Sequence, residues 1–193
     1  LQAVGLSGVD AELLTARRRP PVNVVDDAGH SSVVDYGHVG DIMNVDPRVL
    51  TTLMDARFVP VVASLAGDND GNVYNVNADT AAAEIAIALQ AQKLVLMTDV
   101  AGVKDAEGQV LDFLDAPTAK QHIQSGVIKG GMIPKVECAL AAIEQSVRQV
   151  HIIDGRTRLA LLLEIFTDQG VGTELRAQPR NKSESGESRA PVG

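Results

Sequence analysis

The sequence predicts an α/β fold, a three-layer αβα sandwich in which a mainly parallel sheet lies between helices. The apolar runs at 58–65 and 93–99 do not alternate with polar residues, which is typical of parallel strands buried on both faces. The helix expected at 134–147 carries its apolar residues in one stripe, so it would pack against that sheet. The helix expected at 79–92 is apolar nearly all round, which predicts deep burial.

The first part of the chain shows β-rich runs that are broken by turn signals. Residues 2–8 form a short apolar run that predicts a buried strand. The basic segment 16–21 ends in two prolines and is most simply a solvated loop. Two β-rich stretches within 22–42 flank the turn-forming residues DDAGHSS and predict an antiparallel hairpin.

A helix, a strand and a loop are expected next. Asp46 is the expected N-cap of a helix over 46–56, with Pro47 at the first helical position. The apolar run 58–65 predicts a buried strand. Segment 66–75 is rich in Gly, Asp and Asn, and it therefore predicts a loop of turns.

From residue 79 onward, helices and strands alternate regularly. The helices are expected at 79–92, 117–125, 134–147 and 157–166, and the strands at 93–99, 149–154 and 172–175. Residues 176–193 hold almost no large apolar side chain, which predicts a disordered tail. The chain is therefore expected to form one domain over 1–175, followed by that tail.

Composition limits the functions open to the chain. Its 193 residues carry a formal net charge of −8, which argues against a protein that binds nucleic-acid backbones through a basic face. The single cysteine, Cys138, rules out an intrachain disulfide and fits a reducing compartment, so a cytoplasmic location is expected. No run of about 18 apolar residues is present, and no membrane-spanning helix is predicted.

Asn75, Asn77 and Asp79 occupy alternate positions where the helix at 79–92 is expected to begin. One interpretation is structural: Asn77 would be an N-cap and Asp79 a first-turn acid, both usual at a helix start. That interpretation leaves Asn75 unexplained. The other interpretation is a polar pocket that all three side chains line.

The loop TDVAGV (98–103) follows the strand expected at 93–99. In an open parallel sheet, ligands bind at the carboxyl ends of the strands, where such loops lie. Asp99 and Gly102 are typical of a simple turn. The alternative is that backbone groups of this loop cradle a nucleotide, and both interpretations stay open.

The segment GVIKGGMIPK (126–135) has features of a phosphate site. Gly130 and Gly131 permit close backbone approach, and Pro134 is expected to start a helix whose N-terminus carries partial positive charge. Lys135 lies in the first turn, where the helix dipole disfavours a cation, and this indicates an anion close by. No G-x-x-x-x-G-K-[ST] motif occurs in the chain, so the segment is not a P-loop.

Four segments, YNVNAD, TDVAGV, GGMIPKVE and HIIDGR, together resemble the acetylglutamate kinases of the amino acid kinase family. The similarity extends from about residue 2 to residue 175. It implies an amino-acid-kinase-like fold. It also implies an enzyme that transfers the γ-phosphoryl group of ATP, with Mg²⁺, to the side-chain carboxylate of N-acetyl-L-glutamate in arginine biosynthesis.

The resemblance also implies roles for individual residues. Asn75 would bind acetylglutamate, Asp79 would hold the catalytic lysines in position, and Lys135 would neutralise charge on the transferred phosphoryl group. The residues that would flank ATP are Thr98, Asp99, Val100, Ala101, Gly102, Val103, Val127, Ile128, Lys129, Gly130, Gly131 and Met132. His151, Glu164 and Gly170 resemble the L-arginine site of inhibited members, and packing plus a turn would explain them equally well.

The resemblance covers only the carboxyl-terminal two-thirds of such a kinase. Family members begin with a lysine before paired glycines, a second glycine-rich loop and a substrate-binding arginine, and the sequence shows none of these. We therefore expect this chain to lack the amino-terminal lobe, to be inactive alone and to belong to a homo-oligomeric kinase. Two alternatives stay open: a kinase of carrier-protein-linked aminoadipate, disfavoured by Asn77 and Ala78, and a catalytically dead module that binds nucleotide or arginine.

Overall fold

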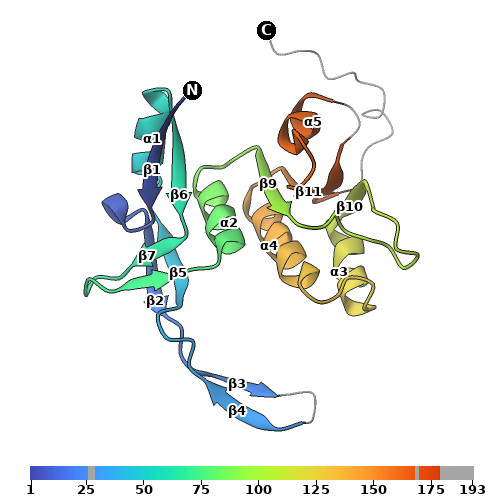
Figure 1. The fold of residues 1–193 in the computed structure, drawn as a ribbon, viewed down its shortest axis with the longest axis horizontal. Coiled ribbons are helices and arrows are strands. Elements are labelled where there is room, and N and C mark those ends of the chain that lie inside the picture. Colours follow the sequence, from blue (N-terminus) through green and yellow to red (C-terminus); the bar gives the residue numbers. More distant parts are fainter. Residues whose placement is uncertain (26–28, 168–169, 179–193) are drawn as a thin grey trace. The chain divides into compact units, whose positions relative to one another are not determined.

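The computed structural model describes residues 1–25, 29–167 and 170–178. The chain divides into two compact units, Leu1–Leu89 and Gln90–Gly193, and each has its own sheets and helices (Figure 1). The predicted α/β class is confirmed. Of the expected tail, the structure describes only the first three residues, and the remainder lies outside the described residues.

The first unit is built mainly from short strands. They are β1 (Gln2–Ser7), β2 (Leu14–Arg18), β3 (Val22–Val25), β4 (Ser31–Val34), β5 (Gly40–Val45), β6 (Phe58–Ala63), β7 (Leu65–Gly67) and β8 (Val73–Asn75). The helices are the 3-10 turn η1 (Asp10–Glu12), α1 (Arg48–Asp55) and α2 (Ala78–Ala88).

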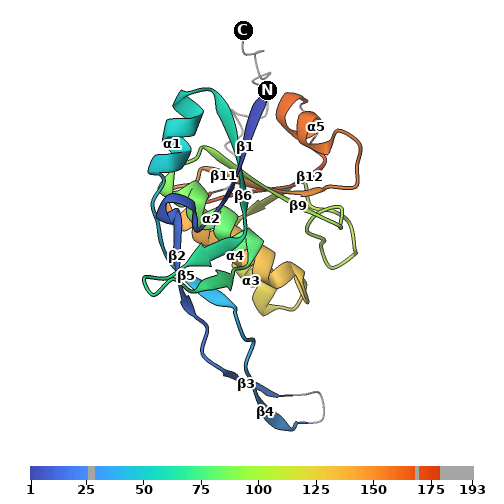
Figure 2. The same cartoon turned by 60° about the vertical axis from the view of Figure 1, so that its left-hand side comes forward.

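These strands form three separate sheets. β1 and β6 pair in parallel, and a four-stranded sheet has the order β5–β2–β7–β8. The hairpin predicted within 22–42 is confirmed as β3–β4, and residues 26–28 of its expected turn lie outside the described residues. It extends away from the four-stranded sheet of this unit (Figure 1 and Figure 2).

The prediction of a solvated loop over 16–21 is wrong for residues 16–18, because these residues belong to β2. β2 pairs antiparallel with β5 and parallel with β7. Leu14 and Ala16 are buried, whereas Arg17 and Arg18 are exposed. The arginines suggested a loop, but the strand is held in the sheet by the buried apolar residues near its start.

The loop expected at 66–75 is instead a hairpin, β7–β8, closed by a turn. Asp68 holds that turn: its carboxylate accepts hydrogen bonds from the Tyr74 hydroxyl at 2.6 Å and from the backbone and side chain of Asn72. These bonds, led by the one from Tyr74, lower the pKa of Asp68 to about 2. The turn residues were recognised correctly, but the flanking strands are too short to give a period-2 pattern.

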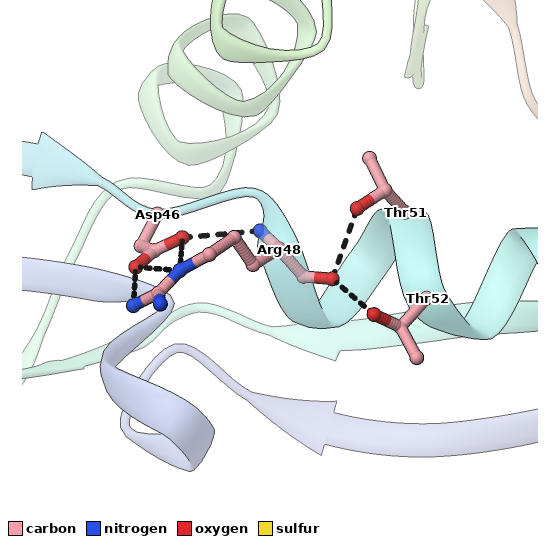
Figure 3. Close-up of polar contacts among 4 residues, drawn as sticks. All are labelled: Asp46, Arg48, Thr51 and Thr52. Carbon is pink, nitrogen blue, oxygen red and sulfur yellow. Dashed lines mark hydrogen bonds and ion pairs between the residues drawn. The ribbon is translucent and has the colours of Figure 1, made fainter.

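Helix α1 begins one residue later than predicted, because Pro47 is the N-cap rather than the first helical residue. Asp46 still supports the helix start. Its carboxylate accepts the backbone N–H of Arg48 and pairs with the guanidinium of the same residue (Figure 3). The Arg48 carbonyl accepts the hydroxyls of Thr51 and Thr52 (Figure 3).

The second unit has three layers. Its strands are β9 (Lys93–Thr98), β10 (Phe113–Asp115), β11 (Gln149–Asp154) and β12 (Gly172–Arg176), and its helices are α3 (Ala116–Gln124), α4 (Met132–Gln145) and α5 (Ala160–Phe166). The sheet order is β10–β12–β11–β9, with β11 and β12 antiparallel and the other pairs parallel. Helices α3 and α4 lie on one face and α5 on the other (Figure 1 and Figure 2). Because both faces of β11 are covered, four consecutive residues, 150–153, are buried.

Gly8 lies where the chain leaves β1, in a space that admits no side chain. A Cβ at Gly8 would lie 2.0 Å from the Leu65 carbonyl oxygen and 2.6 Å from Cδ1 of Leu14, whereas a Cβ at Gly5 would meet nothing within 4 Å. We expect Gly8→Ala to lower the free energy of unfolding by about 1–3 kcal/mol through overpacking. Gly5→Ala should leave it unchanged or slightly raised. Urea denaturation followed by circular dichroism measures both, and equal losses would contradict this packing.

Candidate functional site

The loop after β9 and the segment before α4 border one cavity of about 220 Å³. Its lining residues are Val100, Gly102, Val103 and Lys104 from the loop, and Val127, Ile128, Lys129 and Met132 from the segment. The two segments predicted separately from sequence therefore meet in the second unit. Thr98, Asp99, Ala101, Gly130 and Gly131 are not among the lining residues described.

The cavity combines apolar walls with cations. Most of its lining side chains are aliphatic, and Val103 and Ile128 are almost completely buried. Lys104 and Lys129 are exposed. An apolar cleft with a few charged groups suits a ligand that has a flat apolar part and an anionic part.

Two hydrogen bonds hold the backbone of Val103 in place at the end of the loop. Its N–H donates to the Thr173 hydroxyl oxygen at 2.8 Å, and its carbonyl accepts the Leu111 N–H at 2.8 Å. Gly102 has φ +151, and a Cβ there would lie 2.7 Å from the Thr173 hydroxyl oxygen. Only glycine fits such a position. The backbone of loop 98–103 bends at Gly102, and this bend lines the cavity.

Helix α4 begins at Met132, two residues before the position predicted, with Gly131 as its N-cap. Pro134 and Lys135 therefore lie third and fourth in the helix. The Met132 and Ile133 N–H groups donate to the Lys129 and Gly130 carbonyls, and a proline has no N–H, so this helix end offers partial positive charge rather than free donors. Since Met132 lines the cavity, this partly positive helix end lies beside it.

The polar triad lies in the first unit. Asn77 is the N-cap of α2, because its side-chain oxygen accepts the Thr80 N–H at 3.0 Å, and Asp79 lies in the first turn. The structural interpretation is confirmed for these two residues. Asn75 ends β8, its backbone N–H donates to the His38 carbonyl at 2.8 Å, and its side chain is exposed.

His151, Glu164 and Gly170 come together on the α5 side of the second sheet. Nδ1 of His151 contacts Oε1 of Glu164, and Oε2 of the same carboxylate accepts the Val171 N–H at 2.8 Å. A Cβ at Gly170 would lie 3.1 Å from that carboxylate. His151 is 1% exposed and Glu164 5%, so these residues form a buried polar cluster.

The surroundings of His151 favour its neutral ring at pH values of about 7 and above. Burial lowers its pKa, and the charge of Lys93 lowers it further, while Glu164 and Glu174 act in the opposite direction. Nε2 of His151 has no hydrogen-bond partner among the described residues. A neutral ring that donates from Nδ1 leaves only a lone pair unpaired at Nε2. An imidazolium would instead bury an unpaired cationic N–H.

This neutral histidine makes stability depend on pH. Its pKa is lower in the folded chain than the ordinary value of 6.5, so its stabilising effect is present above that value and is lost as the pH falls below it. We expect the urea concentration at the unfolding midpoint to decrease as the pH is lowered from about 7.5 to about 5.5. This decrease should be smaller in His151→Gln. His38→Gln, at an exposed position, is the matched control. An unchanged pH dependence in His151→Gln would contradict the neutral ring.

Among the residues described, no group of three or more His, Cys, Asp or Glu side chains could hold a metal ion. None of the helices in that part of the chain is long and apolar enough to cross a membrane.

Residues 1–154 match the model of the amino acid kinase family. The chain belongs to this family. It is similar to acetylglutamate kinases of Geobacter sulfurreducens, with 50% identity over 174 residues, and of Hahella chejuensis, with 45% over 172 residues. These alignments cover 90% and 89% of this chain but 59% and 57% of the two relatives. The chain thus spans less than three-fifths of their length, and the resemblance seen in the motifs is confirmed.

Solved structures of other proteins share the fold of this chain. N-acetylglutamate synthase from Neisseria gonorrhoeae, in complex with coenzyme A and L-arginine, has a TM-score of 0.76 at 27% identity. That match covers 92% of this chain and 38% of the synthase chain. Carbamate kinase from Giardia lamblia bound to AMP-PNP shares the fold, with a TM-score of 0.58 at 17% identity over 81% of this chain and 52% of its own.

Two residues at or behind this cavity could not be found from the sequence. Lys104 lines the cavity one residue beyond the predicted loop. Thr173 is 70 positions from its partner Val103, so no local pattern could have linked them.

Proposed function

We propose that this chain supplies the nucleotide site and part of the substrate site of an acetylglutamate kinase. The reaction transfers the γ-phosphoryl group of ATP to the side-chain carboxylate of N-acetyl-L-glutamate and yields N-acetylglutamyl 5-phosphate and ADP. The observation that carries this proposal is the meeting of two family motifs, 98–103 and 127–132, at one cavity. The names of the similar curated kinases suggest the substrate.

The cavity's chemistry suits ATP. Its aliphatic walls would hold the adenine ring, while Lys104, Lys129 and the N-terminus of α4 would face the phosphates. Mg²⁺ usually keeps several waters and is bound partly through substrate phosphates, so it needs no dedicated cage of protein ligands. When bound, it would neutralise charge on the phosphates.

The remaining residues would act by position and charge. A carboxylate nucleophile has no proton to lose, so no general base is required, and the transferred group needs mainly alignment and charge neutralisation. In this proposal Lys135 neutralises the moving phosphoryl group, Asp79 positions the lysines and Asn75 binds acetylglutamate. We further expect the intact kinase to be a cytoplasmic homo-oligomer.

Calorimetric titration of the chain with Mg-ATP, followed by N-acetyl-L-glutamate on the same sample, tests the proposal. Binding of ATP supports the nucleotide site, and subsequent binding of acetylglutamate supports the substrate. Binding of ATP and of aminoadipate on its carrier protein, but not of acetylglutamate, would favour the other kinase. ATP bound without turnover by the intact protein would favour a catalytically dead module. Absence of ATP binding would overturn the proposed site.

Replacement of Lys135 separates phosphate recognition from base recognition. Lys135→Gln should weaken Mg-ATP binding about tenfold or more, the usual effect of losing one hydrogen bond to a charged group, and leave adenosine binding unchanged. Lys120→Gln is the matched control, since Lys120 lies on α3 and pairs with Glu144 at 2.6 Å. Equal losses for ATP and adenosine would contradict a phosphate role for Lys135.

The buried polar cluster favours a second, regulatory role. We infer that His151, Glu164 and Gly170 contribute to a site for L-arginine, because His151 and the backbone at 170–171 surround the Glu164 carboxylate. The similar synthase forms a complex with L-arginine.

L-Arginine should raise the melting temperature of the wild-type chain, and Glu164→Gln should lose the response, because a carboxylate pairs with a guanidinium more strongly than an amide does. Differential scanning calorimetry measures the shift, with D-arginine as the control ligand. An equal shift with both enantiomers, or none in the wild type, would contradict the site.

A further inference from the structure

Thr173 lies on β12, a strand to which no motif assigns a part in the nucleotide site. Its hydroxyl oxygen accepts the Val103 N–H at 2.8 Å, and both residues are 0% exposed. Val103 in turn lines the cavity. A buried side chain of β12 therefore holds the backbone of the cavity wall.

The surrounding contacts leave the wall little freedom. The Val103 carbonyl accepts the Leu111 N–H, so both backbone polar groups of this residue are engaged. Gly102 fits closely against the Thr173 hydroxyl. The Glu174 N–H donates to the Asp112 carbonyl at 3.0 Å. This bond links β12 to the end of the connection between β9 and β10, of which loop 98–103 is the first part.

We propose that Thr173 is a positioning residue for the nucleotide site: its hydroxyl holds Val103 so that the loop leaves the cavity open to the adenine ring of ATP. The inference rests on the proposed function. Removing the hydroxyl would leave the Val103 N–H buried without an acceptor, and such a group is expensive enough that the loop would move to satisfy it. Thr173 touches no nucleotide in this scheme and acts only through the loop.

Thr173→Val keeps the side-chain shape and removes the acceptor, whereas Thr173→Ser keeps the acceptor. We expect Thr173→Val to weaken both Mg-ATP and adenosine binding by about tenfold to a hundredfold, the range that one buried unsatisfied donor produces. Thr173→Ser should stay close to wild type. Hydrogen exchange at the Val103 amide, followed by NMR, should be slow in the wild type and in Thr173→Ser and fast in Thr173→Val.

A control must separate positioning from loss of stability. Val150→Ala removes buried volume from β11, in the same unit, and Val150 does not line the cavity. It should lower the melting temperature without changing nucleotide affinity. If Thr173→Val kept wild-type affinity, or if Val150→Ala lost as much, the positioning role would be overturned. Titration of the wild type alone tests the proposed function, which would be overturned if the wild type bound no nucleotide. The variants then test the role of Thr173 separately.

Discussion

Burial of β11 on both faces is the constraint on which the second unit depends. Helix α4 packs against one face of the strand and α5 against the other, so each has a fixed place on the sheet. β9 pairs in parallel with β11, with Thr98 opposite Asp154. The two strands therefore end at the same edge of the sheet, and the Gly155 N–H donates to the Thr98 carbonyl there at 2.8 Å. The cavity-lining loop leaves from this edge, where parallel sheets usually bind ligands.

Much of this arrangement could be predicted, because long periodic segments carry their own signal. The helix at 79–92 and the strand at 93–99 were found within a few residues, and so was the capping role of Asn77. The strands β2, β5, β7, β8 and β10 were missed. All of them are partly exposed, and all except β5 are shorter than β9. They also depend on partners elsewhere in the chain, such as the pairing of Leu14 with Val45.

The site shows the same division between local and long-range information. Glycine, proline and lysine in 126–135 pointed to an anion because those residue types act through local backbone geometry and the helix end. That this segment meets loop 98–103 at one cavity is a property of the folded sheet. The same holds for the buried contact between His151 and Glu164, which joins a strand to a helix. Membership in the amino acid kinase family names the motifs, and the structure gives the physical reason for their proximity.

The register of β12 positions two different regions of the second unit: the contact of Thr173 with Val103, and the buried polar cluster around His151. In the pairing of β12 with β11, Thr173 lies opposite Ile152 and Glu174 lies opposite His151. Because neighbouring residues of a strand point to opposite faces of the sheet, Thr173 and Glu174 face different sides. A slip of β12 by one residue would turn the Glu174 carboxylate toward loop 98–103 and the Thr173 hydroxyl toward His151. The pairing of β12 with β11 therefore holds both regions in order at once.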